Sequence, residues 1–121
     1  RLGLVGPLST FVAGSQSIPT GNIEGKAEEF YGHKSHKVLD DFSAEWEAGK
    51  TGRVLNSDFL SGFCVAYKRE CLQDLIEAGE DGTFFLDPAF GIGGYDDNDI
   101  AARAVRKGWK LGIASDCYVH H

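Results

Sequence analysis

The chain has 121 residues, of which 42% are hydrophobic and 12% aromatic, enough for one globular domain with a core. Its formal net charge of -6 argues against a nucleic-acid or anionic-membrane surface. No run approaches the length of a membrane span and no signal peptide is visible, so we expect no transmembrane segment. Three cysteines without metal-site spacing are typical of reduced thiols, so we expect a cytoplasmic protein.

Apolar runs and helical periodicity alternate along the chain, and this alternation predicts an α/β fold. The predicted elements, in chain order, are a strand at 2–5, a helix at 35–50, strand formers at 53–67, a helix at 68–78, an extended segment at 83–86, a helix at 97–107, a strand at 109–114 and a last strand at 117–119. Turns are predicted at Gly6-Pro7 and Ser115-Asp116. The weak pattern from 18 to 34 predicts an irregular excursion.

Three polar or glycine positions, two in a predicted loop and one inside a predicted strand, have more than one reading. Ser15 and Gln16 could contact a ligand, but loop polarity explains them equally well. Gly62 stands among strand formers, and a glycine there indicates close approach of a ligand or of another backbone.

Candidate functional side chains are concentrated in residues 91–100. This stretch holds three glycines, one tyrosine and three carboxylates where a helical pattern begins. Carboxylates where a flexible loop becomes a helix can bind a metal, accept a proton or hold sugar hydroxyls. They can equally stabilise the helix start, and Asp96 with Asp99 three residues later resembles a capping box. The spacing does not fit a dinucleotide-binding loop or a calcium loop.

Five pieces of sequence carry a further signal by their order along the chain. They are 3–9, 59–70, 90–100 followed by Arg103, 108–114 and 118–121. Together they resemble the C-terminal half of a family 2 glycosyltransferase with the GT-A fold. The resemblance covers nearly the whole chain, 1–121, and is weakest from 18 to 52. It implies a partial GT-A fold, a mixed sheet flanked by helices, in which the N-terminal nucleotide-binding half is absent.

The resemblance implies an enzyme of the hexosyltransferase kind. Such enzymes transfer a sugar from a nucleotide-sugar donor to an acceptor hydroxyl on a saccharide, lipid or protein. They usually invert the anomeric carbon and use Mn²⁺ or Mg²⁺ on the diphosphate. The residue types agree with this chemistry, because a sugar hydroxyl needs a positioned base to become a good nucleophile.

The resemblance also implies roles for individual residues. Asp97 matches the general base that takes the proton from the acceptor hydroxyl. Gly93, Gly94 and Tyr95 match the loop that lines the acceptor side. Asp96 stands where the family usually has Glu, in the position that contacts the acceptor.

The resemblance also bears on the C-terminal histidines and on the second acid of the motif. His121 matches the histidine that can ligate the metal. His120 points to the opposite face if this segment is a strand, so both side chains are not expected on one metal. We expect Asp99, the second acid of the motif, to cap the helix.

The chain begins inside an apolar segment, and the Asp-x-Asp metal motif of the family does not precede residue 3. We therefore expect a piece of a longer protein, inactive by itself. The alternative is a non-catalytic sugar-binding or interaction domain of the same fold. A metal-dependent hydrolase that uses the acids with His120 and His121, and a retaining transferase, also stay open.

Overall fold

The computed structural model describes residues 1–10, 12–18, 37–50, 52–77, 85–91 and 93–121. Nearly all of the irregular excursion expected at 18–34 and half of the segment expected at 83–86 lie outside these ranges. Within them, strands and helices alternate along the chain, and the α/β fold class is confirmed.

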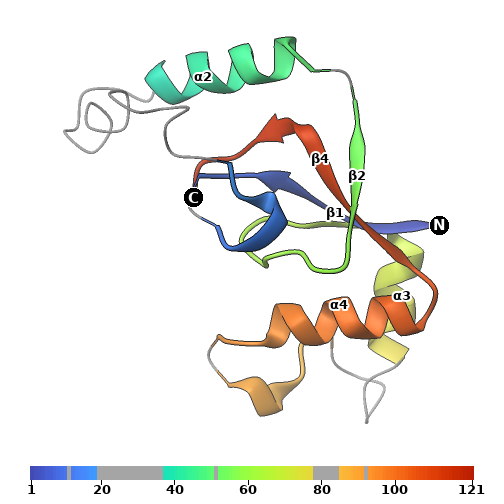
Figure 1. The fold of residues 1–121 in the computed structure, drawn as a ribbon. Coiled ribbons are helices and arrows are strands. Elements are labelled where there is room, and N and C mark those ends of the chain that lie inside the picture. Colours follow the sequence, from blue (N-terminus) through green and yellow to red (C-terminus); the bar gives the residue numbers. More distant parts are fainter. Residues whose placement is uncertain (11, 19–36, 51, 78–84, 92) are drawn as a thin grey trace.

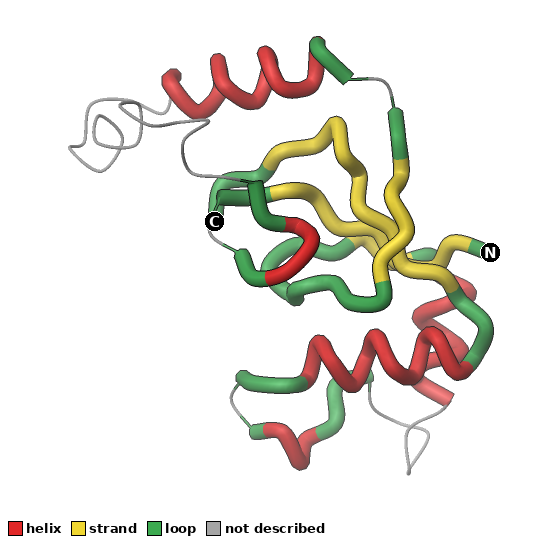
Figure 2. The backbone as a smooth tube through the Cα atoms, viewed as in Figure 1, coloured by secondary structure: helices red, strands yellow, loops and turns green. Residues whose placement is uncertain are grey.

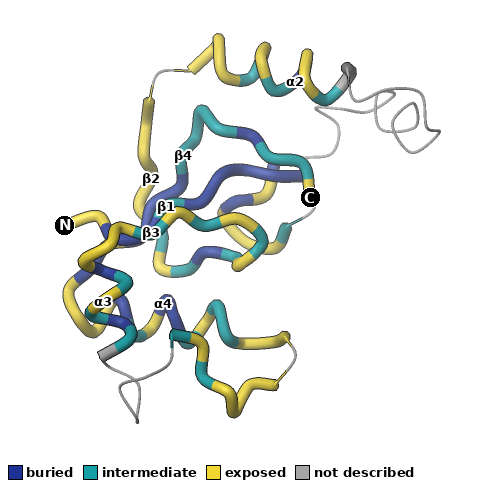
Figure 3. The backbone as a smooth tube through the Cα atoms, turned by 180° about the vertical axis from the view of Figure 1, so that it is seen from behind, coloured by how far each residue is buried: buried dark blue, intermediate teal, exposed yellow. Residues whose placement is uncertain are grey.

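Four strands form one mixed sheet with the order β2-β4-β1-β3 (Figures 1 and 2). The two central strands, β1 (Leu2–Leu8) and β4 (Lys110–Tyr118), run parallel to each other. The edge strands, β2 (Val54–Ser57) and β3 (Ala66–Tyr67), are antiparallel to their neighbours. The central pair is the most buried part of the sheet (Figure 3), and its buried side chains include Leu4, Leu111 and Ile113.

Among the described residues, three α-helices flank the sheet, with α2 (Lys37–Ala48) on one side and α3 (Arg69–Glu77) and α4 (Asp96–Arg106) on the other (Figure 1). The three predicted helices are confirmed, with small differences at their ends. Of the apolar residues that predicted this last helix, α4, Ile100, Ala101 and Ala104 are buried in the core, whereas Val105 is 50% exposed. In the described part of the chain, no helix is long and apolar enough to cross a membrane.

The turn predicted at Gly6-Pro7 is wrong, because β1 continues through both residues to Leu8 and pairs with β4 there. Proline has no amide hydrogen to donate to a sheet, which is why it signals a turn in isolation. Here the Pro7 carbonyl instead accepts a hydrogen bond of 2.9 Å from the Nε2 of Gln16. Gln16 belongs to the short helix η1 (Gly14–Gln16), so β1 and η1 are joined at this point.

The turn predicted at Ser115-Asp116 is also wrong, because β4 passes through it without reversing direction. The pairing with β1 jumps from Ala114 to Tyr118, so the residues between them form a bulge. The amide and hydroxyl of Ser115 both donate to the Arg53 carbonyl, at 3.0 and 2.8 Å. Local turn residues are therefore accommodated inside a long strand.

The strand formers at 53–67 do not make one continuous strand. They supply β2 and β3 at opposite edges of the sheet, and residues 58–65, here named the crossing loop, run between them. The crossing loop lies between the sheet and α4 (Figures 1 and 2). Its Leu60 is 3% exposed and anchors the loop in the core. Gly62 thus belongs to a loop and not to a strand.

The three cysteines differ sharply in environment, and this difference predicts their reactivity. Cys64 is exposed, whereas Cys71 is fully buried. Burial raises the pKa of the Cys71 thiol to about 11, and the nearby Asp74 charge adds to the effect. Because the thiolate is the reactive form, we expect a maleimide at pH 8 to modify Cys64 in the folded protein and Cys71 only after unfolding. Peptide mass spectrometry reads both sites, and equal modification of the two would contradict the burial of Cys71.

Candidate functional site

The candidate site lies at the carboxyl ends of the parallel strands β1 and β4. Helix α4 leads into β4 through a tight turn and therefore runs back along it, so its first turn lies toward the end where β4 finishes (Figure 1). The C-terminal histidines follow β4 at this same end. In open α/β sheets, ligands bind outside the carboxyl ends of the strands. The order of elements thus gathers the predicted site residues where such folds usually bind ligands.

The loop before α4 has an unusual backbone. Gly91, Gly93 and Gly94 have φ values of 65°, 75° and 100°, and Tyr95 follows with a φ of 66°. Glycine adopts these angles freely, but a tyrosine pays roughly 1–2 kcal/mol for them. Tyr95 is nevertheless 75% exposed, and it is the one non-glycine residue with positive φ in the described part of the chain. Strained backbone that presents a large side chain to solvent is characteristic of ligand-binding loops.

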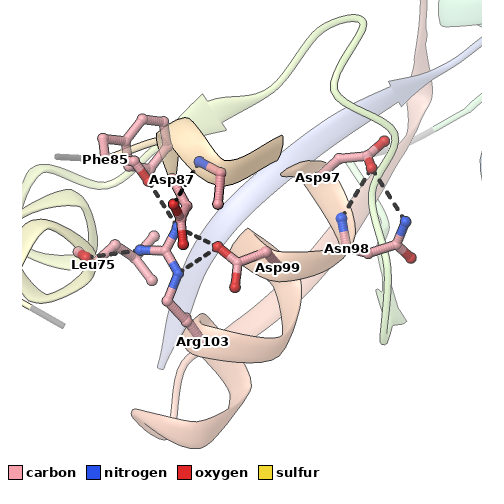
Figure 4. Close-up of polar contacts among 8 residues, drawn as sticks. Leu75, Phe85, Asp87, Asp97, Asn98, Asp99 and Arg103 are labelled. Atoms are coloured by element: carbon pink, nitrogen blue, oxygen red, sulfur yellow. Dashed lines mark hydrogen bonds and ion pairs between the residues drawn. The ribbon is translucent and has the colours of Figure 1, made fainter. Parts of the chain in front are cut away.

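Asp97 occupies the first turn of α4 with a carboxylate that is only partly covered. Its Oδ1 accepts hydrogen bonds from the backbone amide and the side-chain amide of Asn98, at 2.9 and 3.3 Å (Figure 4). Its Oδ2 accepts one from the amide of Gly62 at 3.3 Å. A Cβ on Gly62 would lie 3.6 Å from the Cβ of Asp97, so the close approach expected at this glycine is to α4.

The predicted capping box of Asp96 and Asp99 is wrong. Helix α4 begins at Asp96, and its N-cap is Tyr95, whose side chain makes no capping hydrogen bond. Asp96 is partly buried in the first turn, where a negative charge favours the helix dipole. The carboxylate of Asp99 pairs with Arg103 one turn later, so the expectation that Asp99 caps the helix is corrected to an ion pair along it.

Arg103 ties α4 to two other segments. Its guanidinium reaches the Asp99 carboxylate at 2.8 Å and donates to the carbonyls of Leu75, in α3, and Phe85, at 2.8 and 2.7 Å (Figure 4). Its side chain is 11% exposed. Arg103 thereby fixes α4 against α3 and against the segment that leads into Gly91, Gly93 and Gly94, here named the glycine loop.

The crossing loop contacts both ends of the predicted site. Gly62 donates to Asp97, and the ring of the next residue, Phe63, packs on the ring of His121 with centroids 4.9 Å apart. Two consecutive loop residues therefore connect the predicted base with the predicted metal ligand. The described residues include no group of three or more His, Cys, Asp or Glu side chains that could hold a metal ion. His121 could supply one ligand, but the described residues alone do not fit a complete metal site.

His120 has a different environment from an exposed imidazole. Its Nδ1 lies 3.5 Å from the hydroxyl of Tyr118. Burial, with a smaller effect of the His121 charge, lowers the pKa of His120 below its ordinary value of 6.5. Between the lowered pKa of folded His120 and 6.5, the folded state therefore binds fewer protons than the unfolded state. The stability of the folded state falls as the pH drops through this range.

This shift predicts a pH dependence of folding. Urea unfolding from pH 8 to pH 5 should show a loss of stability on the acid side that is smaller in His120→Gln, because glutamine does not titrate. The comparison is the slope of the unfolding free energy against pH in the two proteins. Identical slopes would show that His120 titrates alike in the folded and unfolded states.

Sequence reasoning missed one residue near the acids. Burial raises the pKa of Tyr67 above its ordinary value, and charge on Cys71, then on Asp96 and Asp97, raises it further. The Tyr67 phenol thus lies in the electrostatic field of the first turn of α4. Its ring packs edge-on against Phe85 at 5.1 Å. The sequence showed only an alternating strand residue, because the acids that influence it come 29 or more positions later.

Two of the hollows on the described surface lie away from these residues. One, of about 280 Å³, is lined by residues that include Asp58, Val105 and Lys110. The other, of about 370 Å³, is lined by residues that include Lys50 and Arg53. Neither of these two hollows is lined by a predicted site residue.

Searches against protein-family models, curated proteins and solved structures find no match to this chain.

Proposed function

We propose that this chain is the acceptor-side half of a GT-A glycosyltransferase of family 2. The full-length protein would transfer a sugar from a nucleotide-sugar donor to the hydroxyl of a saccharide, lipid or protein acceptor. The observation that carries the proposal is the placement of Asp97. Asp97 lies in the first turn of α4, toward the carboxyl ends of the parallel strands, and the loop before this helix presents Tyr95 to solvent. The three free thiols support the further proposal of a cytoplasmic protein.

The hydrogen bonds of Asp97 suggest which atom takes the proton. A carboxylate oxygen can accept about two hydrogen bonds. Oδ1 already receives two from Asn98, whereas Oδ2 receives one from Gly62. Oδ2 therefore keeps room for an acceptor hydroxyl. As that hydroxyl attacks the anomeric carbon of the donor, its proton passes to Oδ2, and the bond from the sugar to the diphosphate breaks.

The neighbouring loop suits the binding of an acceptor. Gly93 and Gly94 have no side chains, so a sugar can approach their backbone closely. The exposed ring of Tyr95 offers an apolar face with a polar tip. Asp96 can accept a hydrogen bond from a sugar hydroxyl. The proposed order along the chain is thus acceptor contacts at 93–96 followed immediately by the base.

One base acting on the attacking hydroxyl matches a single displacement, which inverts the anomeric carbon. The divalent Mn²⁺ or Mg²⁺ that the resemblance implies has one candidate ligand in the described chain, His121. The donor half and the other metal ligands belong, in this proposal, to residues beyond this chain. We therefore expect no transfer by residues 1–121 alone.

The test is a transfer assay with the full-length protein, a panel of nucleotide sugars, and Mn²⁺ or Mg²⁺. Metal-dependent appearance of a glycosylated acceptor is the expected result. Release of free sugar or phosphate without any acceptor would favour a hydrolase. Binding of sugars without turnover, across a panel that covers the common donors, would favour the alternative of a non-catalytic sugar-binding domain.

A further inference from the structure

We infer that Gln16 is a positioning residue of this site: through the crossing loop it sets the positions of Asp97 and His121. The inference rests on the proposed function in naming the two ends of the site. The contacts that carry it are independent of that function. They run from η1 to the crossing loop and from there to the two predicted site residues.

The Gln16 side chain is 1% exposed, and both ends of its amide have partners. Its Nε2 donates to the Pro7 carbonyl at 2.9 Å, and its Oε1 accepts from the amide of Ser61 at 2.7 Å. A carbonyl can only accept and a backbone amide can only donate, so these partners fix the orientation of the side-chain amide. Gln16 thus joins the central strand β1 to the crossing loop.

The space for this amide depends on a glycine. A Cβ on Gly6 would meet the Nε2 of Gln16 and would also crowd the Cys64 carbonyl and the Leu60 side chain. Gly6 therefore allows β1, the Gln16 amide and the crossing loop to pack together at one point. The contact is built into the interior and is not a chance meeting of surface side chains.

Three consecutive residues of the crossing loop carry the connection onward. Ser61 donates to Gln16, Gly62 donates to Asp97, and Phe63 packs on His121. This part of the loop has no regular secondary structure, so its position depends on such tethers. The Gln16 side chain is buried, whereas Asp97 is partly exposed and His121 is exposed. Gln16 is thus an interior tether for residues on the surface. A shift at Ser61 therefore moves the groups that contact both ends of the site.

The kinetic test uses Gln16→Met in the full-length protein, because methionine has a similar length but neither hydrogen bond. Misplacing catalytic groups by about 1 Å can cost roughly 100-fold in rate, so we expect kcat to fall about 10- to 100-fold. The donor KM should change little, since the donor-binding half lies elsewhere. The matched control is Trp109→Phe, which disturbs a residue that is 2% exposed and bonded to Asp74 at the other end of the sheet. A kcat for folded Gln16→Met within twofold of wild type, or an equal loss in Trp109→Phe, would overturn the inference.

Hydrogen exchange measured by mass spectrometry tests the tether without any transferase activity. In Gln16→Met, amide exchange should rise in the peptides that hold residues 61–63 and the first turn of α4, and Trp109→Phe should leave them unchanged. Wild-type protein gives a test even if Gln16→Met does not fold: the Ser61 amide should exchange at least about tenfold slower than an unprotected amide. Unprotected exchange at Ser61 would overturn the inference. A protein without transferase activity that still shows these exchange changes would refute the proposed function and keep the tether.

Discussion

For the proposed transferase, replacing Asp97 by asparagine should lower the turnover of the full-length protein about 100-fold or more, because a positioned general base typically contributes at least that factor. Asparagine has nearly the same shape and keeps one oxygen that can accept from Gly62 or Asn98. It cannot take up the acceptor proton. The binding of donor and acceptor should therefore change much less than kcat. Losing one charge in the first turn of α4 should cost about 1 kcal/mol of stability or less.

The measurement is steady-state transfer by wild type, Asp97→Asn and the control Asp58→Asn. Asp58 is an exposed acid in the crossing loop and lines a hollow at the other end of β4, so its replacement should leave kcat unchanged. If Asp97→Asn turned over like wild type, the enzyme would remain but Asp97 would only stabilise the start of α4. If wild type itself were inactive with every donor, a binding domain of the same fold would become the better description.

The helices could be predicted well because each carries its signal in a short window. Helix α4 repeats apolar residues at helical spacing and is followed closely by Gly108, and no distant contact is needed to recognise it. The turns at Gly6-Pro7 and Ser115-Asp116 were predicted by the same local logic and are wrong. At both places the pairing of β1 with β4 decides the conformation, and its partners lie about 100 positions apart. Long-range pairing therefore overrides strong local turn signals in the centre of the sheet.

The candidate site also has one part that was predictable from local sequence and one part that depends on long-range contacts. The glycine loop, Tyr95 and Asp97 are contiguous in sequence, so a short motif was enough to bring them together. The crossing loop was not predictable as part of the site, because Gly62 meets Asp97 across 35 positions and Gln16 reaches Ser61 across 45. Loop polarity had been an adequate explanation of Gln16 from sequence. Its burial with both amide ends bonded now excludes the alternative that this side chain contacts a ligand directly.

Arg103 illustrates how a residue beside the site can matter more for the fold than for chemistry. Its spacing from Asp99 is that of an ion pair on a helix, which the sequence could suggest. Its bonds to the carbonyls of Leu75 and Phe85 depend on how α3 and the preceding segment pack, which the sequence could not. Together these bonds hold helix α4 in place against α3 and the Phe85 segment. The loop with Gly93, Gly94 and Tyr95 leads directly into α4, so it depends on the position of this helix.

Arg103→Met should therefore destabilise the chain by about 3 kcal/mol or more, since it removes the partner of a partly buried carboxylate and the donor to two carbonyls. The matched control is Arg106→Met, which replaces an exposed arginine in the last turn of the same helix and should stay within about 0.5 kcal/mol of wild type. Urea unfolding of the three proteins measures the difference. Equal midpoints for Arg103→Met and Arg106→Met would mean that the hydrogen bonds and ion pair of Arg103 contribute no more to stability than an exposed charge does. The position of Asp97 would then depend on the helix itself and on the crossing loop, through Gly62, and not on the packing of α4 against α3.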